Sequence, residues 1–169
     1  KRILISFGGS DPSNETTKAL SAIIDLGKKY KIDVIVGTNN PNKKQIMKLC
    51  SKFPFCDFYE QVENISKYMK KADLALGAGG STTWERCCLG LPTIVVNLSK
   101  DQEKITENLS KIGCVINLGS AEKTTKLDYV KALNEINSKK LREISKKCLV
   151  LVDGKGVKRI ANKIFQTEN

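Results

Sequence analysis

The segment from Gly77 to Thr83 (GAGGSTT) contains the residues best suited to binding an anion. Glycines let a backbone approach a ligand closely and adopt positive φ. The first N–H groups of a helix have no partner within it and lie at the positive end of its dipole. A helix that begins near Ser81 could therefore hold a diphosphate, with hydroxyl groups from Ser81, Thr82 and Thr83 as extra donors. Glu85, one turn into that helix, could accept hydrogen bonds from two ribose hydroxyls.

The same segment also permits a purely structural interpretation. It could be a tight turn between a strand and a helix, with a Ser or Thr side chain as N-cap and Glu85 as its capping-box partner. It lacks the Gly-Lys-Ser/Thr sequence of a Walker A loop, and its glycines do not fit the G-x-G-x-x-G spacing of a dinucleotide site. The segment alone leaves both interpretations open.

A second candidate loop, residues 7–14 (FGGSDPSN), follows the first apolar run. Gly8 and Gly9 could pass close to phosphates or a sugar, and Ser10 and Asp11 could contact polar groups of a ligand. Alternatively, the loop only turns the chain, and a Ser or Asn side chain from residues 13–14 caps the following helix.

A third candidate loop, residues 97–102 (NLSKDQ), follows the fifth apolar run. The amide of Gln102 could bind sugar hydroxyls, and Lys100 could face phosphates. Alternatively, this is a solvated loop in which Asp101 caps the next helix.

Two other conspicuous features are expected to be structural. Residues 153–156 (DGKG) should end one helix and begin another. Trp84, the only tryptophan, is expected to lie in the core or to pack half-buried against the loop rather than to stack on a nucleobase.

Short apolar runs alternate with segments of helical periodicity along the whole chain. The runs are continuous rather than alternating, which is typical of strands buried on both faces of a parallel sheet. We therefore predict an α/β fold, a Rossmann-like doubly wound parallel sheet of about six strands, in which ligands bind beyond the carboxyl ends of the strands. The predicted strands are 3–7, 33–36, 55–59, 73–76, 93–96 and 115–118, and the predicted helices are 16–30, 43–50, 64–71, 81–89, 102–112, 125–137, 139–151 and one from 154 to about 165.

Composition narrows the range of partners. The 169 residues carry a formal net charge of +11, mostly as dispersed lysines, whereas a nucleic-acid reader would more often concentrate arginine or interleave aromatic side chains. No apolar run approaches the length of a membrane span. The six cysteines have no zinc-ligand spacing and no histidine accompanies them, so free thiols and a cytoplasmic location are expected.

The motifs together resemble the C-terminal domain of GT-B proteins. They are most similar to the UDP-sugar hydrolases of pseudaminic acid biosynthesis and their relatives in spore coat polysaccharide biosynthesis, with the lipid II glycosyltransferase as a more distant relative. Three separate motifs in the same order carry this resemblance, which covers nearly the whole chain. They are residues 7–12 (FGGSDP), 77–85 (GAGGSTTWE) and 153–156 (DGKG), supported by 88–93 (CLGLPT) and Gln102.

The resemblance implies a role for each matching position. A stretch from the second motif, Gly79, Gly80, Ser81 and Thr82, would hold the diphosphate. Glu85 would bind the ribose, and Val62 would meet uracil through its backbone. Gln102 would face the sugar or the phosphates, with Ser10 and Asp11 as secondary candidates for the same role. The implied reaction is release of UDP from a UDP-diacetamido-trideoxyhexose by water, without a metal or other cofactor.

The chain contains no histidine, although the hydrolases use a catalytic histidine from their N-terminal domain. We therefore expect no catalytic residue here. Residues 1–169 are interpreted as one nucleotide-sugar-binding domain, the C-terminal half of a longer two-domain protein whose N-terminal domain is its partner. The expected ligand is a UDP-sugar. A glycosyltransferase domain of the same fold and a non-catalytic nucleotide-sugar-binding domain remain alternatives.

Overall fold

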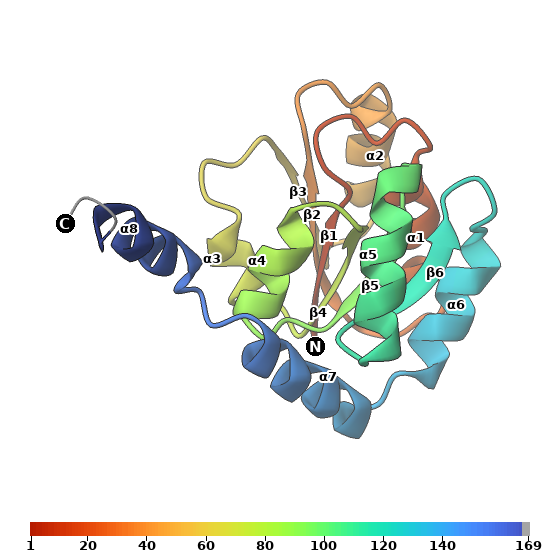
Figure 1. Cartoon of the computed structure of the whole chain (residues 1–169). Coiled ribbons are helices and arrows are strands. Elements are labelled where there is room, and N and C mark those ends of the chain that lie inside the picture. The colour runs from red at the N-terminus through yellow and green to blue at the C-terminus, as the bar shows by residue number, and fades with distance from the viewer. Residues whose placement is uncertain (167–169) are drawn as a thin grey trace.

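The computed structural model describes residues 1–166 and contains a six-stranded, wholly parallel sheet. The strand order is β3-β2-β1-β4-β5-β6, so the predicted doubly wound α/β fold is confirmed (Figure 1). Each apolar run predicted as a strand forms one, within two residues at either end. The strands are β1 (Arg2–Ser6), β2 (Lys31–Val36), β3 (Cys56–Glu60), β4 (Leu74–Ala78), β5 (Thr93–Asn97) and β6 (Ile116–Ser120).

Helices cover both faces of the sheet (Figure 1). One face packs against α1, α2 and α6, and the other packs against α3, α4, α5 and α7. The helices are α1 (Glu15–Asp25), α2 (Lys43–Cys50), α3 (Ser66–Met69), α4 (Thr82–Cys88), α5 (Lys100–Lys111), α6 (Lys126–Glu135), α7 (Ser138–Leu151) and α8 (Gly156–Gln166).

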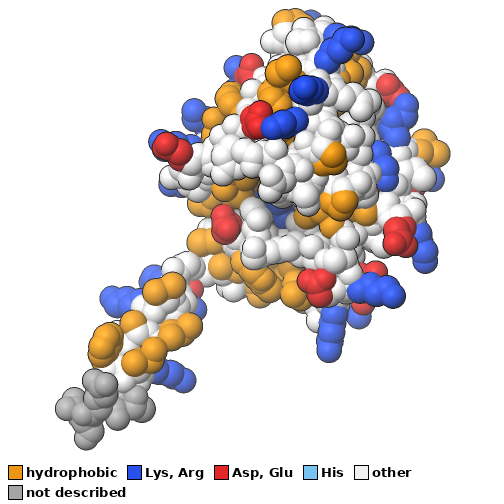
Figure 2. All heavy atoms as spheres, turned by 90° about the horizontal axis from the view of Figure 1, so that it is seen from above, with side chains coloured by type: hydrophobic (Ala, Val, Ile, Leu, Met, Phe, Trp, Pro, Cys, Tyr) orange, Lys and Arg blue, Asp and Glu red, His pale blue; other side chains and the backbone are white. Residues whose placement is uncertain are grey.

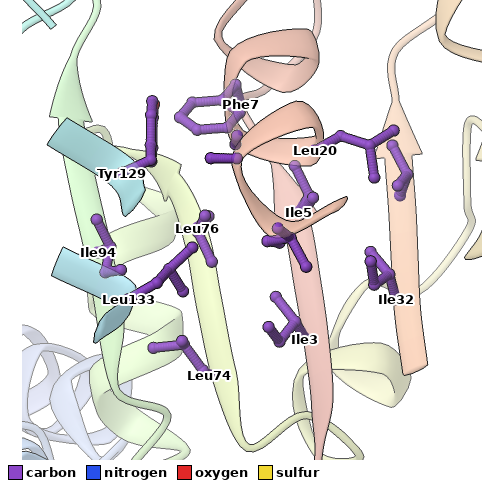
Figure 3. Packing of buried hydrophobic residues seen from close by; sticks show 14 of the residues in the cluster. Ile3, Ile5, Phe7, Leu20, Ile32, Leu74, Leu76, Ile94, Tyr129 and Leu133 are labelled. Atoms are coloured by element: carbon purple, nitrogen blue, oxygen red, sulfur yellow. The ribbon is translucent and has the colours of Figure 1, made fainter. Parts of the chain in front are cut away.

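The larger core lies between the sheet and the helices α1 and α6 that cover one of its faces (Figure 3). Ile3 and Ile5 in β1 and Phe7 directly after it follow one another at every second position, as strand geometry requires for one face. The ring of Phe7 meets that of Tyr129 from α6 edge-on, with centroids 6.4 Å apart. This packing holds the carboxyl end of β1 in place, where the first glycine pair begins.

The strand order creates a crevice between β1 and β4. The chain leaves β1 toward α1 on one face and leaves β4 toward α4 on the other. The two connections diverge at this point, which is where ligands bind in open parallel sheets.

Two predictions differ from the structure. The first helix ends at Asp25 instead of residue 30, because Gly27 adopts a φ of 60° and turns the chain toward β2. Trp84 is 42% exposed, so the core position that was one of its two predicted placements is wrong.

Three other expectations are confirmed. Residues 152–155 separate α7 from α8, which begins at Gly156, and Gly154 adopts a φ of 70°. All six cysteines are free, and five of them are buried. Within residues 1–166, no helix has both the length and the apolar character to cross a bilayer.

Candidate functional site

A cleft of about 230 Å³ opens at the crevice between β1 and β4. Among the positions predicted from sequence, it brings together Gly8, Gly9, Val62, Thr82 and Glu85. Figure 2 looks down on this edge of the sheet and shows a hollow ringed by uncoloured backbone, with basic atoms visible at its floor. The remaining lining residues are Ser6, Ile35, Val36, Gly37, Gln61 and Ile65.

Three consecutive backbone N–H groups, those of Gly80, Ser81 and Thr82, lie at the start of α4. None of them has a hydrogen-bond partner within residues 1–166. The next two backbone amides are already hydrogen-bonded. Thr83 N donates to Gly80 O and Trp84 N donates to Ser81 O, both at 3.0 Å. Unpaired amides at the positive end of a helix favour an anion.

Gly79 has a different role from the one predicted. Its N–H donates to Val96 O at 3.1 Å, so this amide extends the sheet and does not face a ligand. A Cβ on Gly79 would lie 2.4 Å from Thr106 Cγ2 and 2.7 Å from Asn97 Oδ1. Only glycine fits there, and it lets the loop pack closely on β5 and α5.

The three hydroxyl groups of the loop point in different directions. Thr83 is buried, and its Oγ1 donates to Ala78 O at 3.3 Å, so it supports the loop from below. Ser81 is exposed and Thr82 is half-buried, and neither hydroxyl has a hydrogen bond among the described residues. Two of the three predicted hydroxyl donors are therefore available to a ligand.

Glu85 lines the cleft with an exposed carboxylate. Across residues 1–166 this carboxylate has neither a hydrogen bond nor an ion pair, and Ser81 makes no side-chain cap. The alternative in which Glu85 completes a capping box is therefore wrong. The arrangement leaves a bidentate acceptor one helical turn from the three free amides.

Gln102 lies beside the glycine loop with a fixed orientation. Its Oε1 accepts from Leu98 N at 3.0 Å, which directs Nε2 toward the loop, 3.6 Å from the position of a Cβ on Gly80. The side chain is therefore a donor toward the site. Lys100 is exposed at the start of α5, and Asp101 lies inside that helix, so the alternative in which Asp101 caps it is wrong.

Asp11 does not face the cleft. It is 1% exposed, and its two carboxylate oxygens accept from Glu15 N and Thr16 N, each at 2.9 Å. It therefore satisfies the start of α1, which replaces both its predicted ligand contact and the predicted cap from residues 13–14. Ser10 is exposed on the loop that leads to it.

Three features of the site were not predicted. Gly37 contacts the first loop so closely that a Cβ there would lie 2.3 Å from Gly9 O. Gln61 adopts a φ of 52° and lines the cleft next to Val62. Arg86 is buried beneath the glycine loop, where its guanidinium donates to Ala78 O at 2.6 Å. In the sequence, the only signal for Gly37 is its position directly after β2. A charged residue such as Arg86 is normally predicted to lie on the surface.

Similar proteins are found by both sequence and structure. The chain is 28% identical over 165 residues to the spore coat polysaccharide biosynthesis protein SpsG of Bacillus subtilis (strain 168), covering 95% of this chain and 48% of that protein. Its fold matches the crystal structure of Acinetobacter baumannii MurG with a TM-score of 0.85 and 18% identity, covering 98% of this chain and 49% of MurG. A co-structure of S. aureus MnaA with UDP matches with a TM-score of 0.76 and 19% identity, covering 97% and 45% of the two chains.

The chain thus spans about half the length of these relatives. Residues 3–164 match the glycosyltransferase family 28 C-terminal domain, which includes both glycine loops and the cleft between them. The chain therefore belongs to the glycosyltransferase family 28 C-terminal domain family.

Proposed function

We propose that this chain binds the UDP part of a nucleotide sugar in the cleft between β1 and β4. The observation that carries the proposal is a pairing of groups without partners among residues 1–166, namely three amides, those of Gly80, Ser81 and Thr82, and the carboxylate of Glu85. Anion donors and a bidentate hydroxyl acceptor, held one helical turn apart, match a diphosphate joined to a ribose. The UDP-bound co-structure of a protein with the same fold supports this proposal.

Each part of the ligand is assigned to one wall of the cleft. The diphosphate lies against residues 80–82, with hydroxyl groups from Ser81 and Thr82, and the ribose lies against Glu85. Uracil lies near Val62 and Gln61, where backbone groups are close to the cleft. Gly8 and Gly9 form the opposite wall, and Gln102 Nε2 donates to phosphate or sugar.

We propose that the longer protein is an enzyme that releases UDP from a UDP-diacetamido-trideoxyhexose by hydrolysis. The likeness to the spore coat polysaccharide biosynthesis protein supports a role in polysaccharide biosynthesis. This chain has no histidine to act as general base, so the base is proposed to lie on an N-terminal domain outside the chain. The alternative is a glycosyltransferase, which the description of the matching family favours.

Calorimetric titration of the chain with UDP tests the binding proposal. We expect weak, saturable binding that is the same in EDTA as in Mg²⁺, because backbone amides take the place of a metal. Assayed alone with a UDP-sugar, the chain should release no UDP. Absence of binding at millimolar UDP, or turnover by the chain alone, would contradict the proposal, and a product assay on the longer protein separates hydrolase from transferase.

A further inference from the structure

Arg86 places a positive charge beneath the glycine loop. Its side chain is 2% exposed and lies between the carboxyl ends of β1 and β4. One terminal nitrogen, Nη2, donates to Ala78 O at 2.6 Å and to Thr83 Oγ1 at 2.9 Å. The other, Nη1, occupies the space that a side chain on Gly77 would fill, because a Cβ there would lie 2.6 Å from it.

The Glu85 carboxylate favours the charged form of Arg86 but forms no ion pair with this charge. Within residues 1–166, Arg86 has no ion pair, and its Nε is buried without a hydrogen-bond partner. Burial lowers the pKa of Arg86 to about 10, still far above neutral pH, so the guanidinium remains charged. A buried charge without a counter-charge is unfavourable, and a nearby anion relieves it.

The hydrogen bonds of Arg86 also set the shape of the loop. The guanidinium holds the Ala78 carbonyl and the Thr83 hydroxyl beneath the loop, on either side of residues 80–82, whose N–H groups have no partner within residues 1–166. A neutral side chain of similar length could fill this space but could neither donate both bonds nor supply the charge.

We propose that Arg86 is a positioning residue of the phosphate site, whose buried charge is balanced by the diphosphate of the ligand, an inference that rests on the proposed function. The role is to select ligands by their phosphate charge. A diphosphate, which carries more negative charge than a monophosphate, should gain more from this guanidinium.

Titrations of UDP and UMP against the chain test this role, with the fluorescence of the single Trp84 or calorimetry as readout. Arg86→Met should weaken the binding of UDP by about thirtyfold and the binding of UMP by only about threefold, because the lost interaction grows with the charge of the ligand. Arg142→Met is the matched control. Arg142 is exposed near the amino ends of the strands, away from the cleft at their carboxyl ends. This change in net charge should therefore leave the affinities for UDP and UMP within about twofold of wild type.

Equal weakening of UDP and UMP by Arg86→Met, or no weakening of either, would overturn the inference while leaving the proposed function intact. Failure of the wild-type chain to bind UDP would contradict both. If Arg86→Met does not fold by circular dichroism, Arg86→Lys decides, since it keeps the charge but not the paired hydrogen bonds. It should retain the preference for UDP over UMP within about threefold of wild type. Loss of that preference would overturn the inference.

Discussion

The loops after β1 and β4 lie on the two sides of one crevice, and each places an acidic residue shortly after a pair of glycines. Asp11 turns inward and accepts from the N–H groups of Glu15 and Thr16, so those amides at the start of α1 are not available to a ligand. Glu85 lines the cleft, and in the described part of the chain three amides at the start of α4 have no hydrogen-bond partner. Whether such a loop binds an anion thus depends on whether a side chain of the protein already occupies the helix start.

The comparison is tested most strongly at Glu85. Glu85→Ala should weaken the binding of UDP by about 100-fold, because two charge-assisted hydrogen bonds to the ribose are lost. The free energy of unfolding of this variant should differ from wild type by less than about 0.5 kcal/mol, since the carboxylate is exposed and has no partner within residues 1–166. Isothermal calorimetry and thermal melts check the two parts. A large loss of stability would show that Glu85 is structural after all.

The opposite pattern is expected at Asp11. Asp11→Ala should lower the free energy of unfolding by roughly 2 kcal/mol, because two buried N–H groups at the start of α1 lose their acceptor. Its UDP affinity should change far less than that of Glu85→Ala. Urea denaturation measures the stability. A stable Asp11→Ala variant that no longer binds UDP would return Asp11 to the ligand site.

Two adjacent glycines separate packing from binding within the loop after β4. Gly79→Ala should destabilise the fold by about 1–3 kcal/mol, because its Cβ would overlap Thr106 and Asn97. Gly80→Ala meets only ordinary contact with Gln102, so the fold should persist while UDP binding weakens by about tenfold. Melts and titrations of the pair provide the measurement. If both variants lose stability alike, the two glycines do not differ in role.

The smallest effect is expected at a third acid, Asp33, on the buried middle of β2. Burial raises the pKa of Asp33, opposed by the charge of Arg2, whose guanidinium lies 3.3 Å away. A raised pKa means that the ionised carboxylate lowers stability at neutral pH and that protonation relieves this as the pH falls. Asp33→Asn should therefore melt above wild type at pH 7, with the difference shrinking toward pH 4. A variant that melts lower at pH 7 would show that the Arg2 pair outweighs burial.

Much of the fold could be predicted from sequence, because the apolar runs are long enough to mark each buried strand. The end of α1 could not, since helical spacing continues through Leu26 while the turn depends on the positive φ of Gly27. The exposure of Trp84 also escaped prediction. An apolar residue near a loop gives no sign of which way the following helix will face.

The site could be predicted where its parts lie close together in the chain. Glycines, hydroxyls and a carboxylate within residues 77–85 indicated an anion site as one of two interpretations, and the structure leaves the amides of residues 80–82 and the Glu85 carboxylate without partners within residues 1–166. The direction in which a single side chain points could not be predicted, as Asp11 and Thr83 show. Arg86 was missed because its burial depends on β1 and β4 being neighbours, a tertiary contact that the local sequence does not encode.

Amide NMR of the chain during a UDP titration tests the central claim most directly. The account predicts saturable shifts that are largest for the N–H groups of Gly80, Ser81 and Thr82, with little change at Glu15 and Thr16 in the capped start of α1. Shifts centred on α1, or no saturable shift at millimolar UDP, would contradict it.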